Sequence, residues 1–354
     1  MTLRAPEPID RAIRRRAAAL GFDQTGFCRA DPPAERTHFE RWLDQGMHAG
    51  MSWLQRGRAK RLDPRLVLES ARSIIVVTLG YADERGPDTA ASPNADAGIV
   101  SRYAAGDDYH KMMGGRLMAL EEYVESLAPG HRAMAYVDTG PILERMWAAR
   151  AGIGWVGKNA LILNKERGSY FFLGVIITSL ELPADAPALD QCGSCSRCVE
   201  ACPTGAIVEP RVVDSRRCVA YHTIELKGRI PEEHRAAIGR RIFGCDDCQE
   251  ACPWNGPGAP PQREPSSSAT LTELLSMTQA GYMERFRGSA MRRATHQGLR
   301  RNAALALGNT ASDPATLRAL LSVAKDPGED SVVREQAQWS ADRIRARLGA
   351  AGMP

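Results

Sequence analysis

The stretch Cys192-Gly-Ser-Cys195-Ser-Arg-Cys198-Val-Glu-Ala-Cys202-Pro203 decides how the middle of this 354-residue chain folds. Spacers of two, two and three residues, followed by Cys-Pro, are typical of segments that hold [4Fe–4S] clusters. The later stretch Cys245-Asp-Asp-Cys248-Gln-Glu-Ala-Cys252-Pro253 repeats this spacing without its first cysteine, and Cys218 stands alone between the two. Two zinc sites or disulfides are the alternatives, but zinc ribbons use paired Cys-x-x-Cys motifs, so the spacing favours iron.

The spacing also predicts which cysteines share a cluster. Three closely spaced cysteines bind one face of a cubane, whereas the fourth cysteine, before proline, ligates the other cluster. We therefore expect residues 189–255 to form a two-cluster ferredoxin-like domain. Its first cluster would be held by Cys192, Cys195, Cys198 and Cys252, and its second by Cys202, Cys218, Cys245 and Cys248.

Residues 1–188 alternate apolar segments with amphipathic ones, which predicts an α/β domain. Strands are expected at residues 73–81, 131–137, 161–163 and 170–178, and helices at 13–20, 38–43 and 108–127. A further helix is expected from Pro141 to Gly152, because proline suits a first helical position. The domain has neither a GxGxxG motif after a strand nor a P-loop. Since the cysteine-rich segment has no room for a substrate, the electron acceptor must belong to this domain.

The last third of the chain differs in composition. Residues 256–270 are rich in Pro, Gly and Ser and are interpreted as a linker, whereas residues 271–354 have a helical pattern. Residues 301–307 and 334–340 form a weak repeat, which indicates a HEAT-like helical domain or, alternatively, an ordinary helical bundle. From residue 256 onward, 13 Lys and Arg face 9 Asp and Glu, so the whole formal excess of +4 lies there.

Composition and patterning exclude other classes of protein. The 44% hydrophobic and 25% charged residues are typical of a globular chain and exclude global disorder. No apolar run approaches the roughly 20 residues of a membrane-spanning helix. The first residues show no apolar signal segment. We expect a cytoplasmic, monomeric protein without a membrane partner.

Several other stretches resemble the epoxyqueuosine reductase family. They are Ser101-Arg-Tyr-Ala-Ala-Gly-Asp-Asp-Tyr-His110, Val137-Asp-Thr-Gly-Pro-Ile-Leu-Glu-Arg145, Gly152-Ile-Gly-Trp-Val-Gly-Lys-Asn159, Gly168-Ser-Tyr-Phe-Phe-Leu-Gly174, Tyr221-His-Thr-Ile-Glu225 and Ala303-Ala-Leu-Ala-Leu-Gly-Asn309. The resemblance implies a base-off cobalamin in the α/β domain, two [4Fe–4S] clusters and a helical-repeat tail. Its implied substrate is tRNA with epoxyqueuosine at the wobble position, from which the epoxide oxygen leaves as water.

The resemblance also implies residue roles. Asp138 would be the proton donor; the alternative is a cap for the helix expected at Pro141. Asp138 also follows a strand, at the end where α/β folds place chemistry. We interpret His110 as structural. The other implied cobalamin-pocket residues are Arg56, Ser101, Asp108, Tyr109, Lys158, Asn159, Ile162 and Ala220.

The arginine-rich segment at residues 285–301 contains no acidic residue. Such density suits phosphates, although charge runs are often only solvated faces. We predict that Arg292, Arg293, Arg300 and Arg301 contact the tRNA anticodon stem-loop. An external low-potential electron donor is the second expected partner.

Two other functions stay open at this point. A reductive dehalogenase-like enzyme could use the same cobalamin and clusters on a small molecule. A two-cluster ferredoxin fused to a protein-binding helical repeat would bind no cobalamin at all.

Overall fold

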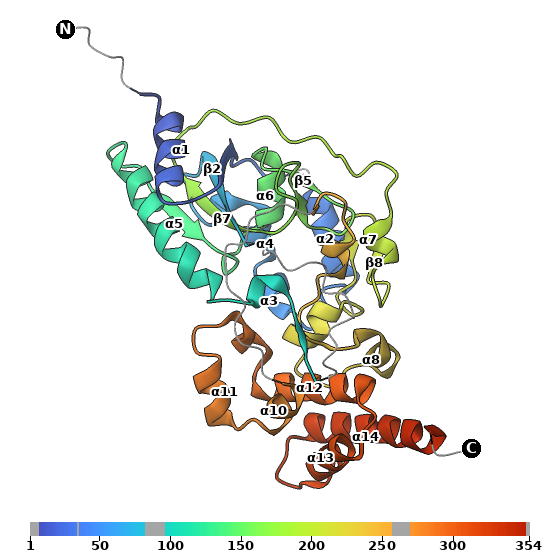
Figure 1. Ribbon diagram of the computed structural model, residues 1–354. Helices are drawn as coiled ribbons and strands as arrows, with labels where there is room; N and C mark the ends of the chain where they lie inside the picture. Colours follow the sequence, from blue (N-terminus) through green and yellow to red (C-terminus); the bar gives the residue numbers. More distant parts are fainter. Residues whose placement is uncertain (1–6, 34, 82–95, 257–269, 352–354) are drawn as a thin grey trace, which may run out of the picture.

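The computed structural model describes residues 7–33, 35–81, 96–256 and 270–351. Its centre is a four-stranded sheet in the order β1-β2-β7-β4, built from β1 (Gln24–Arg29), β2 (Ser73–Gly80), β7 (Phe171–Thr178) and β4 (Ala133–Tyr136) (Figure 1). The strands expected at 73–81, 131–137 and 170–178 are therefore confirmed within a few residues. All three neighbouring pairs are antiparallel. In parallel sheets, active sites lie at the carboxyl ends of the strands, but this sheet is antiparallel. That argument for placing Asp138 at the active site was therefore wrong.

Helices cover both faces of this sheet, which explains the continuous apolar run in β2. Ile75 and Val77 pack against α1 (Ile9–Ala19) and α5 (Tyr109–Ser126), whereas Ile74 and Val76 face α6 (Glu144–Arg150). The helix expected from Pro141 begins only at Glu144, because residues 138–143 form a tight turn. Shorter elements complete the domain: α2 (Arg36–Asp44), α3 (Ser52–Arg56), α4 (Arg58–Leu62), η1 (Pro64–Leu66), η2 (Arg102–Ala104) and the hairpin β5 (Trp155–Val156) with β6 (Ile162–Leu163).

The cysteine-rich segment contains two matching short helices, α7 (Arg197–Glu200) and α9 (Asp247–Glu250), one in each cysteine run. Between them lie β8 (Ile207–Glu209), β9 (Val212–Val213), a π-helical turn η3 (Tyr221–Glu225) and α8 (Glu232–Ile238). Strand β10 (Arg241–Phe243) pairs in parallel with β3 (Ile99–Val100). This pairing attaches the second cysteine run to the α/β domain.

The tail is entirely helical where it is described. It comprises α10 (Leu271–Ser276), α11 (Gln279–Arg285), η4 (Ala290–Ala294), α12 (His296–Thr310), α13 (Pro314–Lys325) and α14 (Ser331–Ala351). The repeated segments fall on α12 and α14, which pack closely: a side chain at Gly308 would collide with Ser340. A HEAT-like arrangement stays a prediction, and the expected linker lies almost wholly outside the described residues.

The tail packs directly under the cysteine-rich segment in Figure 1. Buried residues of β10, α10, α12 and α14 share one core. Within the part of the chain that the structure describes, no helix has the length and apolar character to cross a membrane.

Candidate cofactor and active site

Four cysteines surround a small cavity of about 300 Å³, which we call the small cavity. They are Cys192, Cys195, Cys198 and Cys252, the set expected for the first cluster. Among the described residues, no three His, Cys, Asp or Glu side chains converge on a single metal-ion position. Sulfurs arranged around a cavity suit a cubane better than one zinc ion, whose four ligands must meet at about 2.3 Å.

The other four cysteines lie on the wall of a large cavity of about 1920 Å³. They are Cys202, Cys218, Cys245 and Cys248, the set expected for the second cluster. A pocket for a drug-sized ligand measures roughly 300–1,000 Å³, so this cavity can hold a much larger cofactor with space left beside it. Burial raises the pKa of the Cys245 and Cys248 thiols, so iron binding at this wall must displace protons.

Two residues of the Gly-rich loop separate the cavities. Asn159 lines both of them and donates a hydrogen bond from Nδ2 to the carbonyl of Cys248 at 3.2 Å. Trp155 is 4% exposed, lines the large cavity and donates from Nε1 to Cys192 Sγ at 3.4 Å. The indole also packs edge-on against Trp254, which lines the small cavity. This wall therefore touches cysteines of both expected clusters.

Asp138 lines the large cavity, in the turn after β4. Its φ of 56° is in the left-handed region, which costs a non-glycine residue about 1 kcal/mol or more. The side chain is 64% exposed, and its Oδ2 accepts a hydrogen bond from the Tyr109 hydroxyl at 2.7 Å. Burial and the Asp138 carboxyl raise the pKa of Tyr109, so the phenol remains a donor. Tyr109 itself is stacked on Phe172 at 4.3 Å, which fixes the direction of this bond.

The environment of Asp138 includes side chains that sequence reasoning missed or underrated. Glu144 Oε1 accepts the backbone N–H of Asp138 at 2.6 Å. Arg61 Nη1 donates to the carbonyls of Gly140 and Ile142, each at 3.2 Å. His110, interpreted as structural, contacts Asp108 Oδ1 through Nδ1 at 2.7 Å. It also lines the large cavity, with Nε2 at 3.8 Å from Asp138 Oδ2.

Several expected pocket residues lie at the large cavity, namely Asp108, Tyr109, Asp138, Asn159 and Ala220. Asp108 caps α5, and its backbone N–H donates to the carbonyl of Gly288 in the tail at 2.7 Å. The structure thus ties the start of this helix to the helical domain.

Four other expected pocket residues do not line the large cavity, and their contact with cobalamin stays a prediction. Lys158 lines the small cavity and donates to the carbonyls of Gly193 and Cys195, each at 2.8 Å. Ser101 is 3% exposed and hydrogen-bonded to Asp246, and Ile162 is a core residue of β6. Arg56 is exposed at the end of α3 and donates to Ser52 Oγ, whereas Arg61, one helix later, reaches the large cavity. Sequence offered no signal that distinguishes these two arginines.

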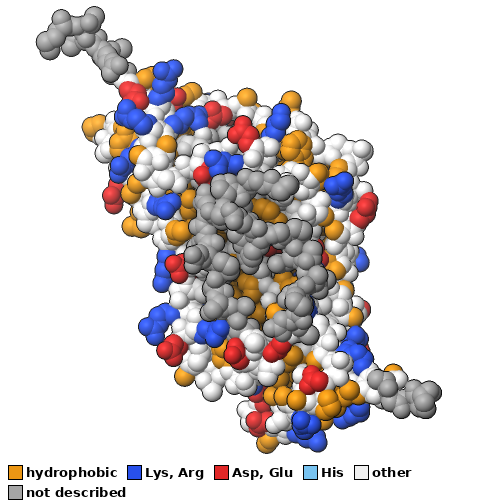
Figure 2. Space-filling model, viewed as in Figure 1, with side chains coloured by type: hydrophobic (Ala, Val, Ile, Leu, Met, Phe, Trp, Pro, Cys, Tyr) orange, Lys and Arg blue, Asp and Glu red, His pale blue; other side chains and the backbone are white. Residues whose placement is uncertain are grey.

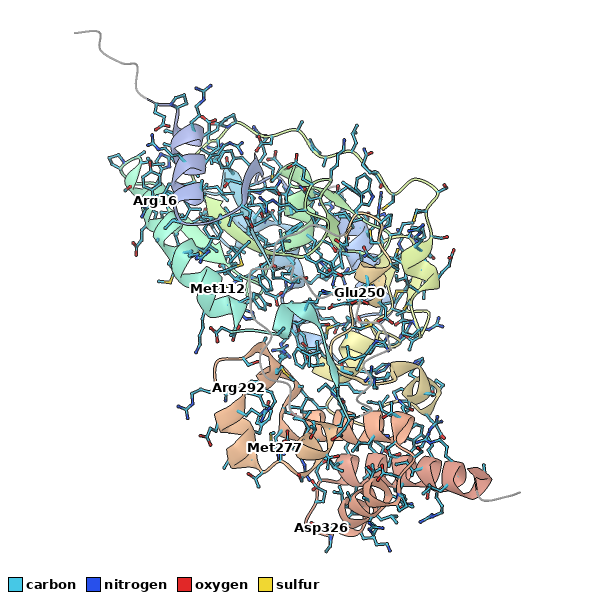
Figure 3. The ribbon with its side chains drawn as sticks, in the orientation of Figure 1. Arg16, Met112, Glu250, Met277, Arg292 and Asp326 are labelled. Atoms are coloured by element: carbon cyan, nitrogen blue, oxygen red, sulfur yellow. The ribbon has the colours of Figure 1, made fainter. Side chains whose placement is uncertain are left out.

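The four arginines predicted to contact RNA divide into two pairs. Arg292 and Arg293 are exposed and line the large cavity, and Figure 3 shows Arg292 at the junction between the tail and the α/β domain. Arg293 lies over the Trp53 ring at 4.9 Å and pairs with Glu225 at 2.9 Å.

The second pair contacts other parts of the chain. The burial of Arg301 is inconsistent with RNA contact, whereas for Arg300 that contact stays a prediction. Arg301 is 1% exposed and donates to the carbonyls of His222, Leu226 and Gly228, while burial lowers its pKa to about 10. Arg300 pairs with Glu329 at 2.6 Å inside the tail. Charge density in a sequence does not tell which helical face is solvated.

On the face shown in Figure 2, basic and acidic side chains of the described residues are interspersed. That face therefore gives no reason to place a polyanion on it. Arg292 and Arg293 are exposed basic side chains at the large cavity, as are Lys111, Arg145 and Arg211.

Comparisons with known proteins agree with this geometry. The profile of the epoxyqueuosine reductase QueG domain matches residues 61–139, and that of the 4Fe-4S double cluster binding domain matches residues 191–255. The chain is 40% identical to epoxyqueuosine reductase of Escherichia coli K12 over 96% of this chain and 92% of that protein. It is 39% identical to the Pseudomonas aeruginosa protein of that name, over 96% of both chains.

Solved structures give the same result. An epoxyqueuosine reductase crystallised with an epoxyqueuosine-modified tRNA-Tyr stem loop superposes with a TM-score of 0.85 at 32% identity, covering 95% of this chain and 90% of that one. The Bacillus subtilis enzyme, solved with its catalytic aspartate loop swung out of the active site, gives 0.86 at 33% identity with the same coverage.

Proposed function

Because this chain belongs to the epoxyqueuosine reductase family, we propose that it reduces epoxyqueuosine to queuosine at the wobble position of tRNA. The main observation behind this proposal is that a candidate acid and candidate cluster ligands line one cavity. Asp138, a candidate acid, and Cys202, Cys218, Cys245 and Cys248, candidate ligands of an electron-carrying cluster, line the same large cavity.

The reaction balances with groups of this kind. Removal of an epoxide oxygen breaks two C–O bonds, forms a carbon–carbon double bond and releases water, which takes two electrons and two protons. The clusters of this family are one-electron carriers at low potential. Cobalamin, bound base-off in the large cavity, would supply the organometallic or electron-transfer chemistry at the epoxide carbon.

The residues of the chain would bind, orient and protonate. Asp108, Tyr109, Asn159 and Ala220 are the predicted cofactor contacts that lie at the cavity. Asp138 would give a proton to the departing epoxide oxygen, with its carboxyl oriented by the Tyr109 hydroxyl. A group for general acid catalysis must reach the reacting atom, and the exposed carboxyl of Asp138 meets this condition.

Arg292 and Arg293 are the proposed phosphate contacts at the same cavity. An enzyme that acts on one base takes that base out of the stack, so a flipped wobble nucleotide would enter beside these arginines. Substitution of both by Gln should weaken stem-loop binding about tenfold or more at low salt and reduce its salt dependence. The same substitution of Arg300, which is half-buried and pairs with Glu329, should affect stability instead.

The remaining expectations concern assembly and surroundings. We propose three domains at residues 1–188, 189–255 and 271–354, with a HEAT-like tail, in a cytoplasmic monomer that takes electrons from an external low-potential donor. The small cavity has exposed residues at its rim, Gln191 and Arg197, where such a donor could approach.

The test is turnover of an epoxyqueuosine stem-loop by anaerobically reconstituted protein, followed by mass spectrometry of the nucleosides. We expect about eight irons per chain, bound cobalamin, and loss of turnover in Asp138→Asn with cobalamin still bound. Iron without cobalamin binding would instead identify the ferredoxin alternative. Turnover of an aryl halide but not of the stem-loop would identify the dehalogenase-like alternative.

A further inference from the structure

The turn that carries Asp138 is unusually constrained. Asp138 has a φ of 56°, and the next N–H, that of Thr139, donates to the carbonyl of Val137 at 2.6 Å. A side chain at Gly140 would lie 2.3 Å from the Tyr136 ring, so the turn folds directly onto β4. A left-handed non-glycine residue persists only where the surrounding structure holds it there. Some part of the structure must therefore hold this turn.

Two side chains hold the turn through its backbone. Glu144 Oε1, at the start of α6, accepts the Asp138 N–H at 2.6 Å. Arg61, from α4, donates to the carbonyls of Gly140 and Ile142 at 3.2 Å. Both side chains line the large cavity, so they contact the turn on the side that faces this cavity.

We propose that Glu144 is the positioning residue for Asp138, with Arg61 as a second attachment. Its carboxyl oxygen, acting as a hydrogen-bond acceptor, keeps the turn in the conformation that presents the Asp138 side chain to the large cavity. This inference rests on the proposed function, in which Asp138 is the acid. A Bacillus subtilis relative has its catalytic aspartate loop swung out of the active site, so a loop of this kind can leave its catalytic position within the family.

Acceptance of a hydrogen bond, and not negative charge, is the property that the turn requires of Glu144. Burial, and then the nearby Asp138 carboxyl, raise the pKa of Glu144 to about 8, against the opposing effects of the Asp138 N–H hydrogen bond, Arg145 and Arg61. The neutral acid is therefore favoured near pH 7, and its carbonyl oxygen still accepts from the Asp138 N–H. A glutamine has the same acceptor at the same position, which makes Glu144→Gln a discriminating variant.

Hydrogen exchange of the Asp138 amide measures this bond directly, without reference to turnover. In the full-length holoenzyme, Glu144→Ala should accelerate exchange of that amide about tenfold, the effect of losing one hydrogen bond. The kcat on an epoxyqueuosine stem-loop should fall about 10- to 100-fold, because small misplacements of a reacting group are costly, while KM stays within about twofold. Glu144→Gln should keep both exchange and kcat within about threefold of the wild type.

Glu125→Ala is the matched control. Glu125 Oε1 accepts the backbone N–H of Ala133 in β4 at 2.9 Å, but this side chain is exposed and lies on α5. The Glu125→Ala substitution removes a carboxylate–amide hydrogen bond to β4, the strand that precedes the Asp138 turn, without changing a contact of the turn itself. Exchange at Asp138 and kcat should both be unchanged in this variant.

The outcomes separate the possible failures. If exchange of the Asp138 amide is unchanged in Glu144→Ala, the positioning role is overturned. If Glu144→Gln has normal exchange but a kcat as low as that of Glu144→Ala, the acceptor role is overturned. Should Glu144→Ala not fold, Arg61→Met, which removes the other attachment, should still accelerate exchange across residues 138–143; unchanged exchange there overturns the inference. If Asp138→Asn keeps full turnover, the acid assignment fails, whereas the exchange result still decides whether Glu144 holds the turn.

Discussion

The two cysteine runs share their spacing and the sequence Glu-Ala-Cys-Pro, yet the residues around them differ. In the first run, Ser196 and Arg197 are exposed, and Glu200 is exposed with Ser196 as its hydrogen-bond partner. In the second run the matching positions are Asp246, Asp247 and Glu250. Asp246 accepts the backbone N–H of Arg102 at 2.7 Å, and Glu250 pairs with the Arg102 guanidinium at 3.1 Å.

The comparison shows what determines the role of each run. The motif supplies ligands, but the residues between the ligands decide which neighbours the run contacts. Gln249 accepts a hydrogen bond from the Ser169 hydroxyl, so this bond and the two contacts of Arg102 attach α9 to the α/β domain. Cys245 and Cys248 are thereby placed at the large cavity, while Cys192, Cys195 and Cys198 of the first run border the small one. We infer that the large-cavity cluster passes electrons to the cofactor and that the small-cavity cluster receives them from outside.

The largest expected effect separates these two roles. Cys248→Ser should reduce turnover about 100-fold or more with any reductant, since it damages the cluster beside the reaction space. Cys195→Ser should have a comparable effect with a protein donor, but should recover to within about tenfold with a small viologen that can enter the large cavity. Turnover assays with both reductants make the measurement, with iron content determined in parallel. Equal loss in both variants with the viologen would contradict the division of roles.

The matched glutamates should differ in their effect on stability. Glu250→Gln removes the carboxylate partner of an arginine that is 5% exposed, which should lower the free energy of unfolding by about 2–4 kcal/mol. Glu200→Gln changes the same motif position on an exposed helix and should cost about 0.5 kcal/mol or less. Denaturant unfolding of the two reconstituted variants tests this. A difference below about 1 kcal/mol would mean that the contacts of α9 do not fix the second run.

How far the sequence predicts this site depends on the range of the interactions. The cysteine sets are predictable because cluster geometry is encoded in spacers of two and three residues. Asp138 and Tyr109 lie in stretches that resemble a family, so they too could be named. Arg61 acts on the Asp138 turn only once the fold brings α4 beside Gly140 and Ile142, and the pattern around Arg61 gives no indication of that contact.

The errors have physical reasons as well. The apolar run in β2 predicts burial on both faces, which is confirmed, but it does not fix strand direction, and the sheet is antiparallel. The charge of Arg301 suggested a solvated face, yet α12 packs against both the cysteine-rich segment and α14. An arginine there satisfies three backbone carbonyls, a role that a sequence cannot distinguish from phosphate binding.

Access to the two cavities should differ in a chelation experiment. The ligands of the small cavity lie beside exposed residues of the first run, so an iron chelator with a mild oxidant should remove that cluster about tenfold faster. Cobalamin should protect the large-cavity cluster further, because it would fill the space through which the chelator enters. Loss of iron in two phases, each of about four irons, followed by absorption and paramagnetic resonance, is the expected result. A single phase for all irons would contradict the difference in access.

The smallest expected effect concerns the cluster potential. The Trp155 indole N–H donates to Cys192 Sγ at 3.4 Å, and hydrogen bonds to cluster sulfurs stabilise the reduced, more negative state. Trp155→Phe should therefore shift the midpoint potential of the small-cavity cluster to more negative values, by an amount equivalent to about two- to tenfold in the redox equilibrium. Trp254→Phe is the control, because Trp254 packs on the Trp155 ring and lines the small cavity. A redox titration followed by paramagnetic resonance should show the shift in the Trp155 variant, a smaller shift in the Trp254 variant, and none at the large-cavity cluster. Equal shifts in both variants would mean that ring packing, and not the N–H···S bond, sets the potential.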